Sequence, residues 1–143
     1  MTAALLDTNI LLYAISTEPA EADKRRIARE LLGGGDWGLS TQVLQEFYVN
    51  ATRGAMPAMS HALAETAIRQ FLLRPLAVND AALMLNALDI KQRFQISFWD
   101  AAIIAAAQAL GAACVYSEDL SHGQGYDGVR VLNPFRDTMP EEA

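Results

Sequence analysis

Two aspartates follow short apolar runs that have the composition of buried strands. Asp7 comes directly after residues 4–6, and Asp119 closely follows the run at 113–116. The carboxyl ends of parallel strands meet at one edge of a sheet, so both carboxylates are expected at that edge. Burying a carboxylate without a partner costs several kcal/mol, and Asp7 within the stretch "ALLDTNILL" therefore needs one.

Two further acids fall on predicted helices. Asp100 lies in the first turn of a nearly all-apolar helix expected over 98–110, and Glu46 lies beside the apolar stripe of a helix expected over 41–51. Each acid taken singly also has a structural interpretation. Asp7 and Asp100 suit helix starts, Glu46 suits a solvated helix boundary and Asp119 suits a turn. Their joint placement is what favours a shared site.

An acidic cluster of this kind points to a hard divalent cation. Clustered carboxylates repel one another and cannot all stay ionised without a cation. Oxygen-only donors suit Mg²⁺ or Mn²⁺ rather than zinc, and the two histidines, His61 and His122, lack ligand spacing. A metal held there can activate water and neutralise a phosphodiester. The chemistry expected is metal-assisted hydrolysis of a phosphoryl ester.

The elements that must position these acids alternate along the chain. Apolar runs near residues 4–6, 37–40, 75–78, 113–116 and 129–132 read as strands, with helices between most of them. Strands joined by helices form right-handed units on a parallel sheet. The predicted fold class is α/β, a three-layer α/β/α sandwich with a short, mainly parallel central sheet. One domain is expected over 1–136, with 137–143 as a flexible tail.

The net charge and the short apolar stretches argue against a general nucleic-acid-binding protein, a secreted protein and a membrane protein. The formal charge of −6 gives no general attraction to nucleic acid, and the basic residues between Lys24 and Arg29 read as a solvated helix face. Trp99 suits packing at a helix start better than stacking on a base. The apolar stretches are too short or too interrupted for a signal peptide or a membrane span, and the single Cys114 suits a reducing compartment. A cytoplasmic location without membrane contact is expected.

The same residues carry a family resemblance. The chain resembles a PIN domain, and more narrowly a VapC-type toxin, through "DTN" with Asp7, Glu46, "FWDAAIIAAA" with Asp100, "YSEDLSHGQ" with Asp119 and the closing "GVRVLNPF". The resemblance runs from Leu5 to about residue 135.

The resemblance implies a Mg²⁺- or Mn²⁺-dependent ribonuclease whose acidic site is formed by Asp7, Glu46, Asp100 and Asp119. Asp7 and Asp100 would be the most secure metal ligands, and Asn9 and Ser117 would hold the acids in place. Ser117 stands where the family often has Thr, which keeps the hydroxyl. RNA as substrate, a cognate antitoxin as partner and a homodimer are also implied.

Other classes with this layout remain alternatives. A haloacid-type phosphatase needs a second Asp two residues after the first, where this chain has Asn9. A receiver-type signalling domain needs a Lys on a late strand, and the runs at 113–116 and 129–132 have none. A non-catalytic binding module that keeps only the PIN fold is the third alternative.

Overall fold

A computed structural model describes residues 2–136 of the chain, so the expected tail at 137–143 lies outside the described residues. Six strands form one sheet in the order β3-β2-β1-β4-β6-β5. They are β1 (Ala4–Leu6), β2 (Trp37–Ser40), β3 (Leu76–Ala77), β4 (Cys114–Tyr116), β5 (Gly125–Tyr126) and β6 (Val129–Leu132). All neighbouring pairs are parallel except β5 with β6. The mainly parallel sheet is confirmed.

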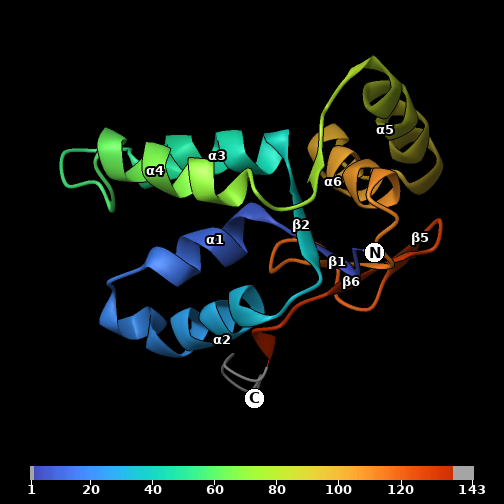
Figure 1. The fold of residues 1–143 in the computed structure, drawn as a ribbon. Coiled ribbons are helices and arrows are strands. Elements are labelled where there is room, and N and C mark those ends of the chain that lie inside the picture. Colours follow the sequence, from blue (N-terminus) through green and yellow to red (C-terminus); the bar gives the residue numbers. More distant parts are fainter. Residues whose placement is uncertain (1, 137–143) are drawn as a thin grey trace.

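Helices join most of the strands. They are α1 (Thr8–Ile15), α2 (Ala22–Gly33), α3 (Thr41–Ala51), α4 (His61–Phe71), α5 (Ala81–Phe94) and α6 (Phe98–Ala109), with a short 3₁₀ turn at Pro19–Glu21. The helices α5 and α6 lie on one side of the sheet, and α1 and α2 lie on the other (Figure 1). The α3–α4 pair extends beyond the sheet next to α1 (Figure 1). This arrangement confirms the α/β/α layers.

The core lies between these layers. The innermost strand β1 is buried along its whole length, and Leu5 pairs with Gly38 on one side and Val115 on the other. The apolar helix α6 is buried without a break from Ala101 to Ala107 and contacts most strands. Burial therefore explains why its sequence is nearly all apolar. Among the described residues, no helix has the length and apolar character needed to span a membrane.

Side-chain caps start most of the helices. Asp7, Ser40, Ser60, Asp80 and Ser97 each accept a hydrogen bond from a backbone N–H in the first turn of the helix that follows. For α1, the sequence indicated that Asp7 suits a helix start and could in addition belong to a shared acidic site. Asp7 is the cap.

The hairpin at the far edge of the sheet was missed. Strand β5 has only two residues and pairs antiparallel with β6 across Asp127 and Gly128, whose φ angles are +49° and +84°. Two consecutive positive φ angles are typical of a tight hairpin turn, and Asp-Gly is a preferred sequence for it. The signal was present in "YDGV". Strand β5, with two residues, is too short to show an apolar pattern in the sequence.

Candidate active site

Asp7 is buried at the junction of β1 and α1. Its Oδ1 accepts from the Thr8 amide at 2.8 Å, and its Oδ2 accepts from the Ser117 hydroxyl at 2.7 Å. The amide of Asp7 donates to the carbonyl of Tyr116, the last residue of β4. The carboxylate therefore lies between the ends of two neighbouring strands, which is the placement expected from the sequence.

Burial raises the pKa of Asp7 from 3.8 to about 6. The hydrogen bonds from Ser117 and Thr8 oppose this shift, and the charges of Glu46 and Asp119 add to it. The sequence predicted that repulsion between the acids would raise some pKa values. The direction is confirmed for Asp7, but burial is the largest cause and repulsion is a smaller one.

Glu46 reaches this position from the middle of α3. Its Oε2 accepts from the Thr8 hydroxyl at 2.8 Å, and its Oε1 accepts from Gln42 Nε2 at 3.0 Å. The Gln42 amide also lies 3.4 Å from the carbonyl of Trp99 at the start of α6. Glu46 is therefore fixed to α1 by Thr8 and connected to α6 through Gln42, which is more than a solvated boundary position would give.

Asp119 approaches from the loop after β4. Asn9 Nδ2 lies 3.2 Å from Asp119 Oδ2, and Asn9 Oδ1 accepts from the amide of Glu118. The Ser117 hydroxyl accepts from the amide of Asp119 and lies 3.4 Å from Asn9 Nδ2. Asn9 thus bonds the carboxylate of Asp119 and Ser117 that of Asp7, and these are the two residues that the family resemblance implies as supports.

Asp100 is the acid with the fewest connections. Its amide donates to the Ser97 hydroxyl in the first turn of α6, and within residues 2–136 no hydrogen bond reaches its carboxylate. In the same part of the chain, no three His, Cys, Asp or Glu side chains stand close enough together to hold a metal. The oxygen-only donors have the chemistry of a Mg²⁺ or Mn²⁺ site. The structure connects three of them, and the role of all four acids as metal ligands stays a prediction.

A second network holds the loop from its other side. Glu118 accepts from the Tyr13 hydroxyl at 2.6 Å and from Lys24 Nζ at 2.5 Å. Lys24 also lies 4.9 Å from the centre of the Tyr13 ring and 5.9 Å from that of Phe135. The Glu118 contacts raise the pKa of Lys24, so this side chain stays charged. Glu118, Tyr13 and Lys24 were not among the predicted site residues.

The helix that carries Lys24 is not simply a solvated basic face. Arg25 donates to the carbonyl of Ser16, and Arg29 donates to the carbonyl of Ala14. Both carbonyls lie at the end of α1, so these guanidinium groups join α2 to α1. Arg26, paired with Glu30, is exposed as expected. The prediction was wrong for Lys24 and Arg25, which are partly buried because α2 packs against α1, whereas Arg29 is exposed as expected although it bonds Ala14.

The supporting residues that the sequence missed are Thr8, Gln42 and Glu118. Thr8 stands within the "DTN" motif, and Gln42 lies one helical turn before Glu46, where i and i+4 side chains meet. These two could have been proposed from spacing. Glu118 could not, because Lys24 lies 94 residues away in sequence.

Comparisons with known proteins agree with this fold and site. The carboxylates gather at the carboxyl edge of a mainly parallel sheet, where α/β proteins place their active sites. The PIN domain family model matches residues 4–124. The chain therefore belongs to the PIN domain family. A comparison with curated protein sequences gave no match.

Solved structures share the fold. A toxin-antitoxin complex from Klebsiella pneumoniae gives a TM-score of 0.68 at 19% identity over 92% of this chain and 98% of that one. VapC20 of Mycobacterium tuberculosis, described as a Sarcin-Ricin loop cleaving toxin, gives a TM-score of 0.64 at 21% identity over 82% of this chain and 90% of that one. DNA-bound VapBC of Salmonella typhimurium gives a TM-score of 0.64 at 19% identity over 92% of this chain and 97% of that one.

Proposed function

We propose that this protein is a divalent-metal-dependent ribonuclease and the toxin of a toxin–antitoxin pair, acting in the cytoplasm. The observation that carries the proposal is the connected acidic cluster at the carboxyl edge of the sheet. Asp7, Glu46 and Asp119 come from three separate elements, and Thr8, Asn9 and Ser117 hold them together. A stable fold does not require such repulsive neighbours, so a ligand of opposite charge is the simplest reason for them.

Asp7, Glu46, Asp100 and Asp119 would hold Mg²⁺ or Mn²⁺. When bound, such a cation supplies a nucleophilic water and stabilises charge on the phosphate. The residues of this chain prepare the site. Ser117 and the Thr8 amide orient the Asp7 carboxylate, Thr8 orients that of Glu46, and Asn9 orients that of Asp119. Their hydrogen bonds fix the orientation of each of these carboxylates.

The toxin assignment is supported by what the similar structures are. Several are toxin–antitoxin complexes, and one is described as a Sarcin-Ricin loop cleaving toxin. We therefore propose RNA as the substrate, an antitoxin as the partner that blocks the site, and a homodimer. Apolar residues of α3 and of the segment after α4 differ in whether they could supply a partner surface. Phe47 is fully buried in the core, whereas Leu73 after α4 is 80% exposed.

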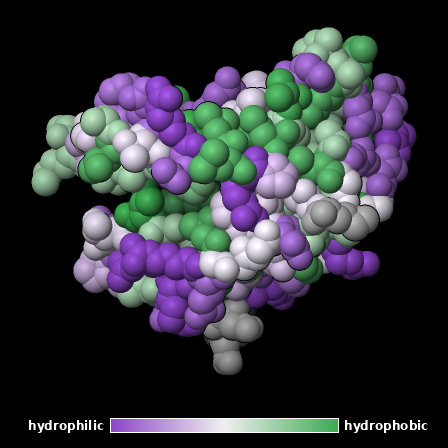
Figure 2. Space-filling model, in the orientation of Figure 1, coloured by the Kyte–Doolittle hydropathy of each residue, from purple (hydrophilic) through white to green (hydrophobic). Residues whose placement is uncertain are grey.

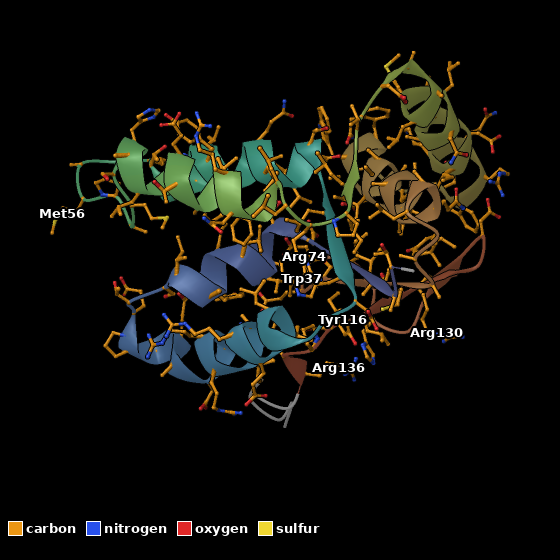
Figure 3. All side chains as sticks on the ribbon, in the orientation of Figure 1. Trp37, Met56, Arg74, Tyr116, Arg130 and Arg136 are labelled. Carbon is orange, nitrogen blue, oxygen red and sulfur yellow. The ribbon has the colours of Figure 1, made fainter. Side chains whose placement is uncertain are left out.

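A recess suited to a partner segment lies between α1 and the α3–α4 loop. It has a volume of about 660 Å³, and its lining includes Leu12, Ile15, Met56 and Pro57. Figure 2 shows apolar side chains gathered between the two helical pairs. Met56 extends outward at the loop, where it is 95% exposed (Figure 3). An antitoxin segment with apolar side chains would find complementary surface here.

The ribonuclease proposal is tested with purified protein free of antitoxin. Structured and unstructured RNAs are incubated with the wild type, Asp7→Asn and Asp100→Asn, each with Mg²⁺, with Mn²⁺ and with chelator. We expect cleavage by the wild type only when metal is present, and a loss of about 100-fold or more in each variant. Cleavage that continues in chelator, or that persists in both variants, contradicts the mechanism.

A further inference from the structure

Trp99 is 63% exposed, although it begins a buried helix and immediately precedes Asp100. The expectation that it packs at a buried helix start was wrong, because most of the indole is exposed. The contrast with Trp37 is sharp, because Trp37 is buried and donates its indole N–H to the carbonyls of Leu32 and Gly34. Trp37 also stacks under the guanidinium of Arg74 at 3.9 Å (Figure 3). Trp37 has a structural role that Trp99 lacks.

The backbone of Trp99 is nevertheless connected to the acidic site. Gln42 Nε2 lies within 3.4 Å of the Trp99 carbonyl and bonds Glu46 at 3.0 Å with the same group. Phe98 packs against the indole edge to face, with ring centres 5.2 Å apart. The exposed indole therefore lies one residue before Asp100 in the chain. The backbone carbonyl of Trp99 is joined to Glu46 through the Gln42 side chain.

Few basic side chains are left without a protein partner to contact the phosphates of an RNA substrate. The chain has eleven Lys and Arg against seventeen acids, and most of the cations already have partners. Arg26, Arg69, Arg93 and Lys24 pair with acids, while Arg25, Arg29, Arg74 and Arg130 donate to backbone carbonyls. Among the described residues, only Arg53, Lys91 and Arg136 make none of these bonds. Contacts to phosphates, which usually dominate affinity for nucleic acid, are therefore limited.

Trp99 is also separate from the exposed apolar side chains of α5. Residues 95–97 alone join α5 to α6, and Asn86 in the first half of α5 bonds Gln108 near the end of α6, so the helices run antiparallel and Trp99 lies near the carboxyl end of α5. At that end the exposed α5 residues are Lys91, Gln92 and Arg93, whereas the exposed Leu85 lies toward the other end. The exposed indole beside this charged helix end offers a flat face on which a nucleotide base can stack.

From these observations we infer that Trp99 binds an unpaired base of the RNA substrate by stacking, next to the acidic site. The inference rests on the ribonuclease function proposed above and narrows its substrate to RNA with unpaired bases. A base inside a duplex is covered on both faces and cannot stack on the indole. Every base has a π-face, so the contact gives affinity without fixing the sequence.

The test measures the cleavage rate against RNA concentration in Mg²⁺. The probe is an unstructured oligoribonucleotide that contains all four bases, and the same sequence in a perfect duplex is run in parallel. We expect Trp99→Ala to raise the half-saturating concentration about 10- to 100-fold with little change in the maximal rate. Trp99→Phe should recover most of the loss, whereas Trp99→Leu, which is apolar without a π-face, should not. The duplex should resist cleavage.

The matched control is Leu85→Ala, because Leu85 is also 63% exposed on a neighbouring helix. It should leave both parameters unchanged. A second measurement replaces one nucleotide at a time by an abasic one. One abasic position should weaken binding to the wild type and have no effect on Trp99→Ala. The loss caused by Trp99→Ala should also be the same at low and high salt, because stacking releases no counterions.

The outcomes are distinguishable. An unchanged half-saturating concentration in Trp99→Ala, with active wild type, overturns the stacking role and leaves the ribonuclease proposal standing. If Trp99→Ala instead changes the oligomeric mass in sedimentation, Trp99 is a protein contact and the inference is wrong. Absence of RNA cleavage by the wild type overturns the ribonuclease proposal and the inference with it.

Discussion

Asp7 combines two roles in one carboxylate. One oxygen caps α1 through the Thr8 amide, and the other accepts from Ser117 at the end of β4. Capping stabilises the helix, but burial of the charge opposes folding at neutral pH. The raised pKa of about 6 measures that cost, because it shows how strongly the folded site favours the protonated acid. A bound cation would reverse this preference.

The first prediction follows from the pKa of Asp7. With a folded value near 6 and an unfolded value of 3.8, the folded protein binds more protons between pH 4 and pH 6. The contribution of Asp7 to stability is therefore complete below pH 4 and is lost as pH rises through 6, by about 3 kcal/mol in total. Asp7→Asn should lack this loss. Urea unfolding in chelator from pH 4 to pH 7 gives the difference between the two proteins.

Asp23→Asn provides the control, since Asp23 is an exposed acid on α2. Its free energy of unfolding should follow the wild type across the same range. Parallel stability curves for the wild type and Asp7→Asn would show that the buried carboxylate does not titrate in this window, contrary to the prediction.

The loop after β4 shows how separate elements cooperate to place one side chain. Ser117 and Asp119 contact Asn9 on the side of the acidic cluster, whereas Glu118 contacts Tyr13 and Lys24. Asp119 is exposed, and its carboxylate has one hydrogen bond, from Asn9. Its position therefore depends on the loop backbone, which the Glu118 network attaches to α1 and α2.

Loss of this attachment should affect both stability and activity. Lys24→Met leaves Glu118 bonded only to Tyr13 and should lower the free energy of unfolding by about 1–2 kcal/mol. RNA cleavage should fall about 10-fold or more, because residues that orient metal ligands commonly have effects of this size. Lys24→Met combined with Glu118→Gln should cost less than the sum of the two single changes. Urea unfolding and initial cleavage rates give both quantities.

Arg26→Met is the matched control on the same helix, because the Arg26–Glu30 pair is exposed and lies away from the loop. It should change neither quantity measurably. Lower stability in Lys24→Met with full activity per folded molecule would show that the network holds the helices together without positioning Asp119.

The protein as a whole is acidic and concentrates repulsive charge at the edge of its sheet. Anything that binds the folded state alone stabilises it, and a cation among these acids should do so at neutral pH. At 100-fold excess over its dissociation constant, Mn²⁺ should raise the melting temperature by about 5–10 °C. Thermal unfolding with Mn²⁺ and with chelator measures this. The double variant Asp7→Asn with Asp100→Asn should lose the shift.

Equal melting temperatures for the wild type with and without saturating Mn²⁺ would argue against a carboxylate metal site. A shift that persists in the double variant would place the cation elsewhere on the surface. Both readouts are independent of cleavage, so they test the metal site without relying on the choice of RNA.

Local sequence was sufficient for most of the elements and for the location of the acids. The strand-to-helix transitions at Leu6–Thr8 and Ser40–Thr41 are visible as apolar runs that end at capping residues. Strand β5 was missed because two residues form a strand only when β6 lies beside them. Trp99 was misplaced because an aromatic residue in an apolar helix predicts burial, and the first turn of α6 leaves it uncovered.

The sequence by itself determined the class of fold and the presence of acids at strand ends, because strand and helix periodicities and caps are local properties of the chain. Only the tertiary structure decided which groups meet. The bonds of Thr8 to Glu46, Ser117 to Asp7 and Lys24 to Glu118 join residues 38, 110 and 94 positions apart. The raised pKa of Asp7 has the same origin, since burial and the charges of distant acids arise only when the elements pack together.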